Sequence, residues 1–226
     1  IDTEEPNRQP IPKPDIRRML IPIGPVVVFA ASNFPLAFST AGGDTASALA
    51  AGNPVIVKAH SSHLGTSALI GSAIIKAAEN CEMPDGVFSM LFGSGRIIGQ
   101  ALINHPSVKA VGFTGSRTAG RLLFDIASQR DEPIPFFAEM GSINPTLILP
   151  EAMKNMPEKI AKLLAGSINL GTGQFCTNPG LLLLLKCEGY DRFIDELKNA
   201  ISLSNPAVML NENIYKSFEA NKKSLL

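Results

Sequence analysis

A cysteine and a glutamate stand in surroundings that could support nucleophilic chemistry. Cys176 lies among small and polar residues in Gly-Gln-Phe-Cys-Thr-Asn-Pro-Gly (173–180), and Glu139 precedes it in Phe-Phe-Ala-Glu-Met-Gly. A thiolate attacks carbonyl carbon readily, and small neighbours leave room for a carbonyl substrate. The carboxylate could then activate a water molecule as a general base. The alternative is a buried structural cysteine and an unrelated surface glutamate, and this pair alone does not decide between them.

The composition excludes several classes of partner. Hydrophobic residues make up 45% of the 226 residues, and 20 Lys and Arg balance 20 Asp and Glu. This balance favours neither nucleic acid nor an anionic membrane, and the apolar runs are too short to span a bilayer. Three cysteines cannot form a complete disulfide framework, so we expect a cytoplasmic protein. The first residue is Ile1, and the last residues have a helical pattern, so we expect a piece of a longer polypeptide.

Strand-like and helix-like segments alternate along the first part of the chain. The apolar runs typical of strands are 23–29, 54–58, 87–92, 108–113 and 134–138. The segments typical of helices are 40–51, 66–80, 96–104 and the stretch from Ser116 to about 127. This alternation predicts an α/β fold with a doubly wound, Rossmann-like parallel sheet.

The pattern continues after Glu139 with new landmarks. Short strands are expected at 146–149 and 181–186, and helices at 157–166 and 190–201. We therefore expect residues 1–138 to form a nucleotide-binding domain and residues 139–226, which include Cys176, to begin a second α/β domain.

Polar residues follow several of the predicted strands, at the sheet edge where α/β proteins bind ligands. In Gly-Phe-Thr-Gly-Ser (112–116), backbone N–H groups and the Ser116 hydroxyl could bind a phosphate, although Ser116 could equally be an ordinary helix N-cap. Lys58 could reach a ribose or phosphate, or extend along the surface into water. The Asn33 amide could donate to an oxyanion, or could belong to a turn.

The three histidines, His60, His63 and His105, suggest neither a metal site nor a hydrolase. His60 and His63 form a His-x-x-His pair without further ligands, so we expect no metal. A cysteine hydrolase needs a histidine base, and all three histidines lie in the expected nucleotide-binding domain. Cys81 and Cys187 lack the small neighbours of Cys176, and we expect them to be structural thiols.

Five motifs together resemble the aldehyde dehydrogenase superfamily. They are Asn33-Phe34-Pro35, Val57-Lys58, Phe113-Thr114-Gly115-Ser116, Glu139-Met140-Gly141 and Gly173-Gln174-Phe175-Cys176. The resemblance covers essentially the whole chain. It implies that Cys176 is the nucleophile, that Glu139 is the general base, and that Asn33 and the Cys176 backbone N–H form the oxyanion hole. The implied cofactor contacts are Ser32, Lys58, His60, Ser61, Gly95, Phe113, Thr114, Gly115 and Ser116.

The resemblance implies oxidation of an aldehyde to a free acid through a thiohemiacetal and a thioester on Cys176, with hydride transfer to a nicotinamide cofactor. The CoA-acylating relatives typically lack a base at the position of Glu139. Many NAD-preferring members read Lys-Pro-Ser-Glu where this chain reads Lys58-Ala59-His60-Ser61. Without that carboxylate, a 2′-phosphate is not repelled, so NADP is the expected cofactor, and NAD remains an alternative.

Longer stretches resemble one branch of the family, which oxidises 2,5-dioxovalerate or, with NADP, long-chain fatty aldehydes. Ala31–Ser39, Gly42–Ser47, Pro135–Ser142 and Gln174–Gly180 carry this likeness, and the lead-in Pro14–Arg18 favours the dioxovalerate activity. The resemblance also implies a homodimer or homotetramer. The family's segment that positions the nicotinamide ribose is absent from these 226 residues. We therefore expect this piece alone to be inactive, at most a nucleotide-binding fragment.

Overall fold

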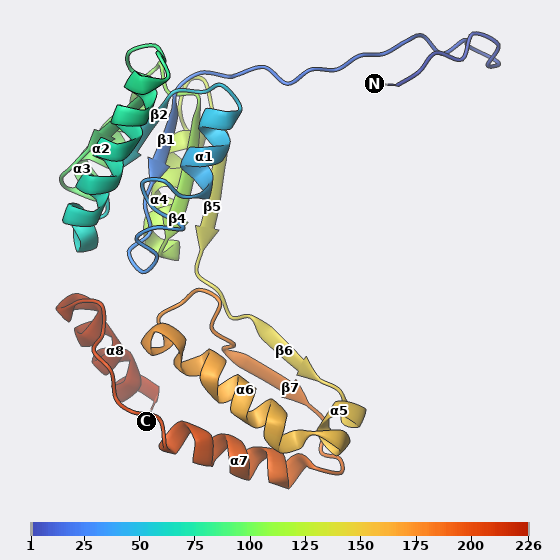
Figure 1. The fold of residues 1–226 in the computed structure, drawn as a ribbon, viewed down its shortest axis with the longest axis vertical. Coiled ribbons are helices and arrows are strands. Elements are labelled where there is room, and N and C mark those ends of the chain that lie inside the picture. Colours follow the sequence, from blue (N-terminus) through green and yellow to red (C-terminus); the bar gives the residue numbers. More distant parts are fainter. Residues whose placement is uncertain (1, 226) are drawn as a thin grey trace.

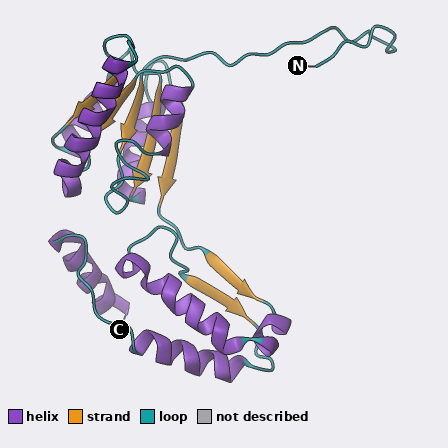
Figure 2. Cartoon of the chain, viewed as in Figure 1, coloured by secondary structure: helices purple, strands orange, loops and turns teal. Residues whose placement is uncertain are grey.

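The computed structural model describes residues 2–225, which form two α/β parts joined by a short linker (Figure 1). The first part is a five-stranded sheet between helices, and the second is a smaller sheet with helices beside it (Figure 2). The residues before the first strand form an extended lead-in that runs away from the body of the molecule. Within it, Asp2 and Glu5 pair with Ile16 and Lys13 as isolated bridges.

The large sheet is entirely parallel. Its strands are β1 (Val26–Phe29), β2 (Val55–Lys58), β3 (Phe88–Leu91), β4 (Ala110–Gly115) and β5 (Phe136–Met140). They lie in the order β3-β2-β1-β4-β5, with β1 paired to both β2 and β4. The chain reverses its direction of winding between β1 and β4, and in such sheets ligands bind outside the carboxyl ends of the strands at that point.

Helices cover both faces of this sheet, as a doubly wound fold requires. They are α1 (Gly43–Ala50), α2 (Leu64–Asn80), α3 (Gly95–Asn104) and α4 (Arg117–Ser128). Because successive strand residues point to opposite faces, β1 supplies Val26 and Val28 to a core under α1 and α2, and Val27 and Phe29 to a core under α3 and α4. The predicted fold class is confirmed.

The second part is built on a two-stranded parallel sheet of β6 (Pro145–Ile148) and β7 (Leu181–Leu184). The further elements are η1 (Ser61–His63) in the first part and α5 (Pro150–Asn155), α6 (Pro157–Asn169), η2 (Leu170–Gly173), α7 (Tyr190–Ser202) and α8 (Glu212–Leu225). Phe193 of α7 and Met153 of α5 are fully buried in the core of the second part, beside Ile148. The segment before α8 reaches back to the first part, since Asn211 Nδ2 donates to Ser62 Oγ at 3.0 Å.

The strand at the expected domain boundary lies two residues later in the chain than its apolar run suggested. Strand β5 continues through Glu139, which pairs with Thr114 of β4, so residue 138 lies inside a strand of the first sheet. The change from one sheet to the other falls in residues 141–144, between β5 and β6. We propose that the two domains divide there.

Among the described residues, none of the helices has the length and apolar character needed to span a membrane.

Candidate active site

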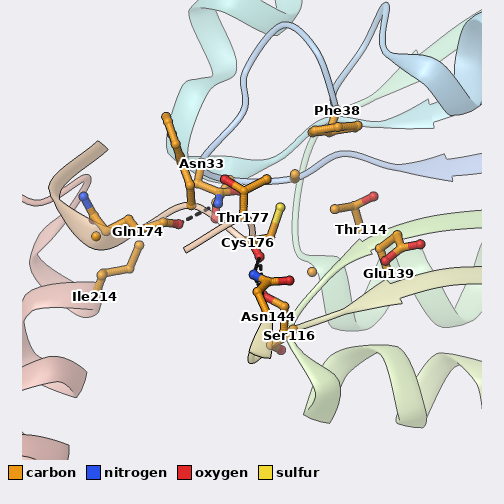
Figure 3. A pocket seen from close by; sticks show the side chains of 17 residues that line it. Asn33, Phe38, Thr114, Ser116, Glu139, Asn144, Gln174, Cys176, Thr177 and Ile214 are labelled. Atoms are coloured by element: carbon orange, nitrogen blue, oxygen red, sulfur yellow. Dashed lines mark hydrogen bonds between the residues drawn. The ribbon is translucent and has the colours of Figure 1, made fainter. Parts of the chain in front are cut away.

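A cavity of about 730 Å³ lies where the carboxyl ends of β4 and β5 meet the second part (Figure 3). Its wall includes Cys176, Glu139 and Asn33, which come from three separate segments of the chain. The loop after β1 supplies Asn33, β5 supplies Glu139, and the loop between η2 and β7 supplies Cys176. The fold therefore brings together the three residues that the sequence suggested for catalysis.

The loop that carries Cys176 is shaped by a left-handed turn. Gly171, Thr172 and Gly173 all have positive φ, at 60°, 59° and 69°. Glycine adopts this conformation without steric cost. At Gly171 a side chain is also excluded by packing, because a Cβ would lie 2.7 Å from the Phe175 ring. The turn ends at Gly173, and the exposed Cys176 follows three residues later.

Aromatic and amide contacts join this loop to the segment after β1. The rings of Phe175 and Phe34 stack with centroids 4.3 Å apart. Asn33 Nδ2 donates a hydrogen bond of 2.7 Å to the Gln174 carbonyl. An amide nitrogen carries two N–H groups, so this bond uses one of them. Asn33 is thus held beside the nucleophile loop, and its predicted role in the oxyanion hole stays a prediction.

Glu139 lines the same cavity from β5, the strand at one side of the sheet, and is exposed (Figure 3). A second carboxylate, which the sequence analysis missed, stands near it. Asp44 in the first turn of α1 packs over Gly112 of β4, where a Cβ would lie 3.0 Å from its carboxylate. Burial, and then the charge of Glu139, raise the pKa of Asp44. The stretch Gly42–Ser47 was singled out for its family likeness, but nothing in it indicated that Asp44 packs near Glu139.

A second cavity, of about 450 Å³, adjoins the first along the carboxyl ends of β1, β2 and β4. The two cavities share Ser32, Thr114, Gly115 and Ser116. All nine residues expected to contact the cofactor line this second cavity; they are Ser32, Lys58, His60, Ser61, Gly95, Phe113, Thr114, Gly115 and Ser116. An elongated ligand could therefore occupy both cavities with one end near Cys176.

Lys58 is buried beneath this second cavity instead of extending into water. Its relative exposure is 7%, and no carboxylate of the described residues lies within ion-pair distance of it. Burial lowers its pKa, as expected for an ammonium group removed from water. A buried cation without a carboxylate partner favours an anionic or hydroxyl-bearing ligand in the cavity.

Two further basic side chains line the second cavity near Lys58. His60 Nδ1 accepts a 3.1 Å hydrogen bond from the Ser62 backbone N–H, so the proton of the neutral ring is on Nε2. Burial, then His63 and Lys58, lower the pKa of His60. Arg96, the second residue of α3, was missed in the sequence. Its position directly after Gly95 at a helix start was the available signal.

In the structure Ser116 is the N-cap residue of helix α4. Its Oγ accepts a 3.3 Å hydrogen bond from the Ala119 backbone N–H and so caps α4. The hydroxyl hydrogen still remains for donation to a ligand, because a hydroxyl can accept and donate at once. Helix α4 lies close to the sheet at Gly120, where a Cβ would lie 2.6 Å from Met140 Sδ.

None of the three histidines lines the cavity that holds Cys176. His63 Nε2 lies 2.7 Å from the Ala31 carbonyl oxygen, and its Nδ1 lies 3.1 Å from Ser67 Oγ, so both ring nitrogens have local partners. Within residues 2–225, no group of three or more His, Cys, Asp or Glu is close enough to hold a metal ion. Cys81 is exposed after α2, and Cys187 packs against the core of the second part.

The chain belongs to the aldehyde dehydrogenase family, whose sequence model matches residues 4–208. It is 52% identical over 225 residues to alpha-ketoglutaric semialdehyde dehydrogenase 2 of Azospirillum brasilense. It is 49% identical over 226 residues to alpha-ketoglutaric semialdehyde dehydrogenase of Acinetobacter baylyi. Both matches cover 100% of this chain but 43% of the relative, so the chain spans less than half the length of these proteins.

A solved structure with the same fold contains a nicotinamide cofactor. It is an indole-3-acetaldehyde dehydrogenase of P. syringae in complex with NAD+ and IAA. The superposition has a TM-score of 0.70 with 28% sequence identity, and covers 84% of this chain and 36% of the other.

Proposed function

We propose that the complete protein oxidises an aldehyde to a carboxylic acid with NADP+ or NAD+. The observation that supports this most is the common cavity of Cys176, Glu139 and Asn33, which adjoins a second cavity lined by all nine expected cofactor residues. The buried, unneutralised Lys58 also fits a nucleotide, because ribose hydroxyls and phosphates accept hydrogen bonds from an ammonium group.

In this proposal, the Cys176 thiolate attacks the carbonyl carbon, and a C–S bond forms as the carbonyl oxygen becomes an alkoxide. The Cys176 backbone N–H and the second Asn33 N–H donate to that oxygen. A bound nicotinamide cofactor supplies the hydride acceptor, and loss of the hydride leaves a thioester on Cys176. Glu139 then removes a proton from water, the water oxygen attacks the thioester carbon, and the Cys176 thiolate leaves as the acid is formed.

We propose 2,5-dioxovalerate as the substrate and 2-oxoglutarate as the product. The two relatives named alpha-ketoglutaric semialdehyde dehydrogenase, at 52% and 49% identity, support this choice. None of the described residues that line the catalytic cavity is Lys or Arg, so the group that pairs with the substrate carboxylate would come from the remainder of the protein.

A long-chain fatty aldehyde is the second candidate substrate. Phe38 and Ile214 line the catalytic cavity and give it an apolar portion. The test is to compare kcat/KM of the complete protein for 2,5-dioxovalerate and for dodecanal. A higher value for the dioxo acid supports the first proposal, and a higher value for dodecanal supports the second.

We propose NADP as the preferred cofactor. The second cavity is lined by the basic residues Lys58, His60 and Arg96, and none of its described lining residues is acidic. Such a wall attracts a 2′-phosphate without rejecting a 2′-hydroxyl, so NAD binding is retained at lower affinity. The dissociation constants of NADP+ and NAD+, measured by titration calorimetry, test this preference.

The remaining expectations concern the complete protein. We propose that it is cytoplasmic and forms a homodimer or homotetramer, and that the 226-residue piece alone has no aldehyde oxidation activity. Size-exclusion chromatography with light scattering measures the assembly, and NADPH formation by the isolated piece would contradict its predicted inactivity.

A further inference from the structure

The linker between β5 and β6 runs beside the loop that carries Cys176. Because Pro145 of β6 is paired with Leu181 of β7, the residues just before each strand are also neighbours. The Gly180 backbone N–H donates to the Ile143 carbonyl at 2.7 Å. The linker follows directly from the strand that carries Glu139, so these contacts connect the segment of the base to the segment of the nucleophile.

One side chain in this linker makes most of the connection. Asn144 Nδ2 donates to the Cys176 carbonyl at 2.5 Å and to the Asn178 carbonyl at 2.9 Å. Both N–H groups of the amide are therefore used on the backbone of the nucleophile loop. Ser142 Oγ also donates to the Cys176 carbonyl and lies 3.3 Å from Asn144 Nδ2. The carbonyl of the nucleophile is thus held by two side chains of the linker.

The backbone of Asn144 accounts for the residue type at this position. Its φ of 48° is in the left-handed region, which asparagine tolerates better than other residues with a side chain. Glycine would adopt the same backbone but has no donor, and aspartate would direct a carboxylate at two carbonyl oxygens. Asparagine combines the required backbone with two N–H donors.

We propose that Asn144 is a positioning residue that fixes the Cys176 peptide relative to Glu139. Its side chain lines the catalytic cavity, but this role requires no contact with substrate or cofactor. By orienting the carbonyl of Cys176 and the following peptide, it limits rotation of the loop that presents the thiol and the Cys176 N–H. Misplacement of a nucleophile by about 1 Å can reduce a rate on the order of 100-fold. This role depends on the proposed aldehyde oxidation, whereas the clamp on the loop is independent of it.

The test uses Asn144→Gly in the complete protein, because glycine removes both donors without straining the backbone. We expect kcat for aldehyde oxidation to fall by about 10- to 100-fold, while the dissociation constant of NADP+ changes by less than about twofold. Hydrogen exchange of the backbone amides in 174–180 should become about 10-fold faster, with exchange in β1 and β4 unchanged. Ser142→Gly leaves the bonds from Asn144 to the Cys176 and Asn178 carbonyls in place, and we expect a smaller loss of kcat.

A matched control separates positioning from general stability. Ile148→Val removes one methylene group from the buried core of the same part and should lower stability while keeping kcat. Unchanged exchange in 174–180 in Asn144→Gly would refute the clamp, and an equal loss of kcat in Ile148→Val would refute the positioning role. A parent protein without turnover would contradict the proposed function instead, and the exchange measurement would still test the clamp.

Discussion

Replacing Lys58 by methionine should weaken cofactor binding and stabilise the cofactor-free protein at the same time. Lys58 is 7% exposed, and none of the carboxylates in residues 2–225 forms an ion pair with it. A hydrogen bond from a charged group contributes about 1.5–3 kcal/mol, so NADP+ affinity should fall by about 10- to 100-fold. Methionine fills a similar volume without a buried charge, and should raise the free energy of unfolding by on the order of 1 kcal/mol.

The direction in which the free energy of unfolding changes with pH also tests the predicted stabilisation by Lys58→Met. Burial lowers the pKa of Lys58, so between its folded pKa and 10.5 the unfolded chain binds more protons than the folded protein. The contribution of Lys58 to the free energy of unfolding is therefore most unfavourable below the folded pKa. The free energy of unfolding rises as the pH rises through that window. The rise should be absent in Lys58→Met.

The assays are titration calorimetry with NADP+ and thermal unfolding without cofactor, each performed on the complete protein. Lys76→Met serves as the control, because Lys76 is an exposed residue of α2. The reasoning would be refuted if Lys58→Met bound NADP+ as tightly as the parent, or if it unfolded at a lower temperature.

Three other substitutions test separate parts of the proposal. Glu139→Gln cannot accept the proton of water, so about one NADPH per site should form in a rapid burst and turnover should then stop; steady turnover at the parental rate would contradict its role as base. Ser61→Glu places a carboxylate in the second cavity and should lower the preference for NADP+ over NAD+ by about 10-fold or more; an unchanged ratio of dissociation constants would argue against 2′-phosphate binding there. Asp44 has a raised pKa, so its unfavourable contribution develops as pH rises from 3.8 through the folded pKa. Asp44→Asn should therefore stabilise the protein at pH 7 and have a smaller effect near pH 4; in urea unfolding, destabilisation at pH 7 would show that the Asp44 carboxylate makes favourable contacts.

Most of the large sheet was predictable because β1, β2, β3 and β4 lie in short apolar runs. Val55–Lys58 and Ala110–Gly115 lie close to their predicted ranges, and both are buried from both sides by helices. Strand β5 was harder to delimit, since its residues alternate between half-buried and exposed, and Glu139 interrupts the hydrophobic run that signals a strand. Helix α5 was missed because it is 6 residues long, begins at Pro150 and is followed closely by Pro157, the first residue of α6.

The site was predictable where a motif surrounds the residue. Cys176, Glu139 and Asn33 each stand in a recognisable stretch, and the fold places them on one cavity. Two of the residues that were missed, Asn144 and Asp44, act through contacts distant in sequence. Asn144 bonds a loop 32 and 34 positions away, and the relation of Asp44 to Glu139 exists only when α1 packs on the sheet. Such contacts leave no local pattern in the sequence.

The most direct test of the central proposal is formation of NADPH by the complete protein given 2,5-dioxovalerate and NADP+, with Cys176→Ala measured in parallel. We predict sustained NADPH formation by the parent, with 2-oxoglutarate as the product, and none by the variant. Equal NADPH formation by parent and variant would contradict the assignment of Cys176 as the nucleophile.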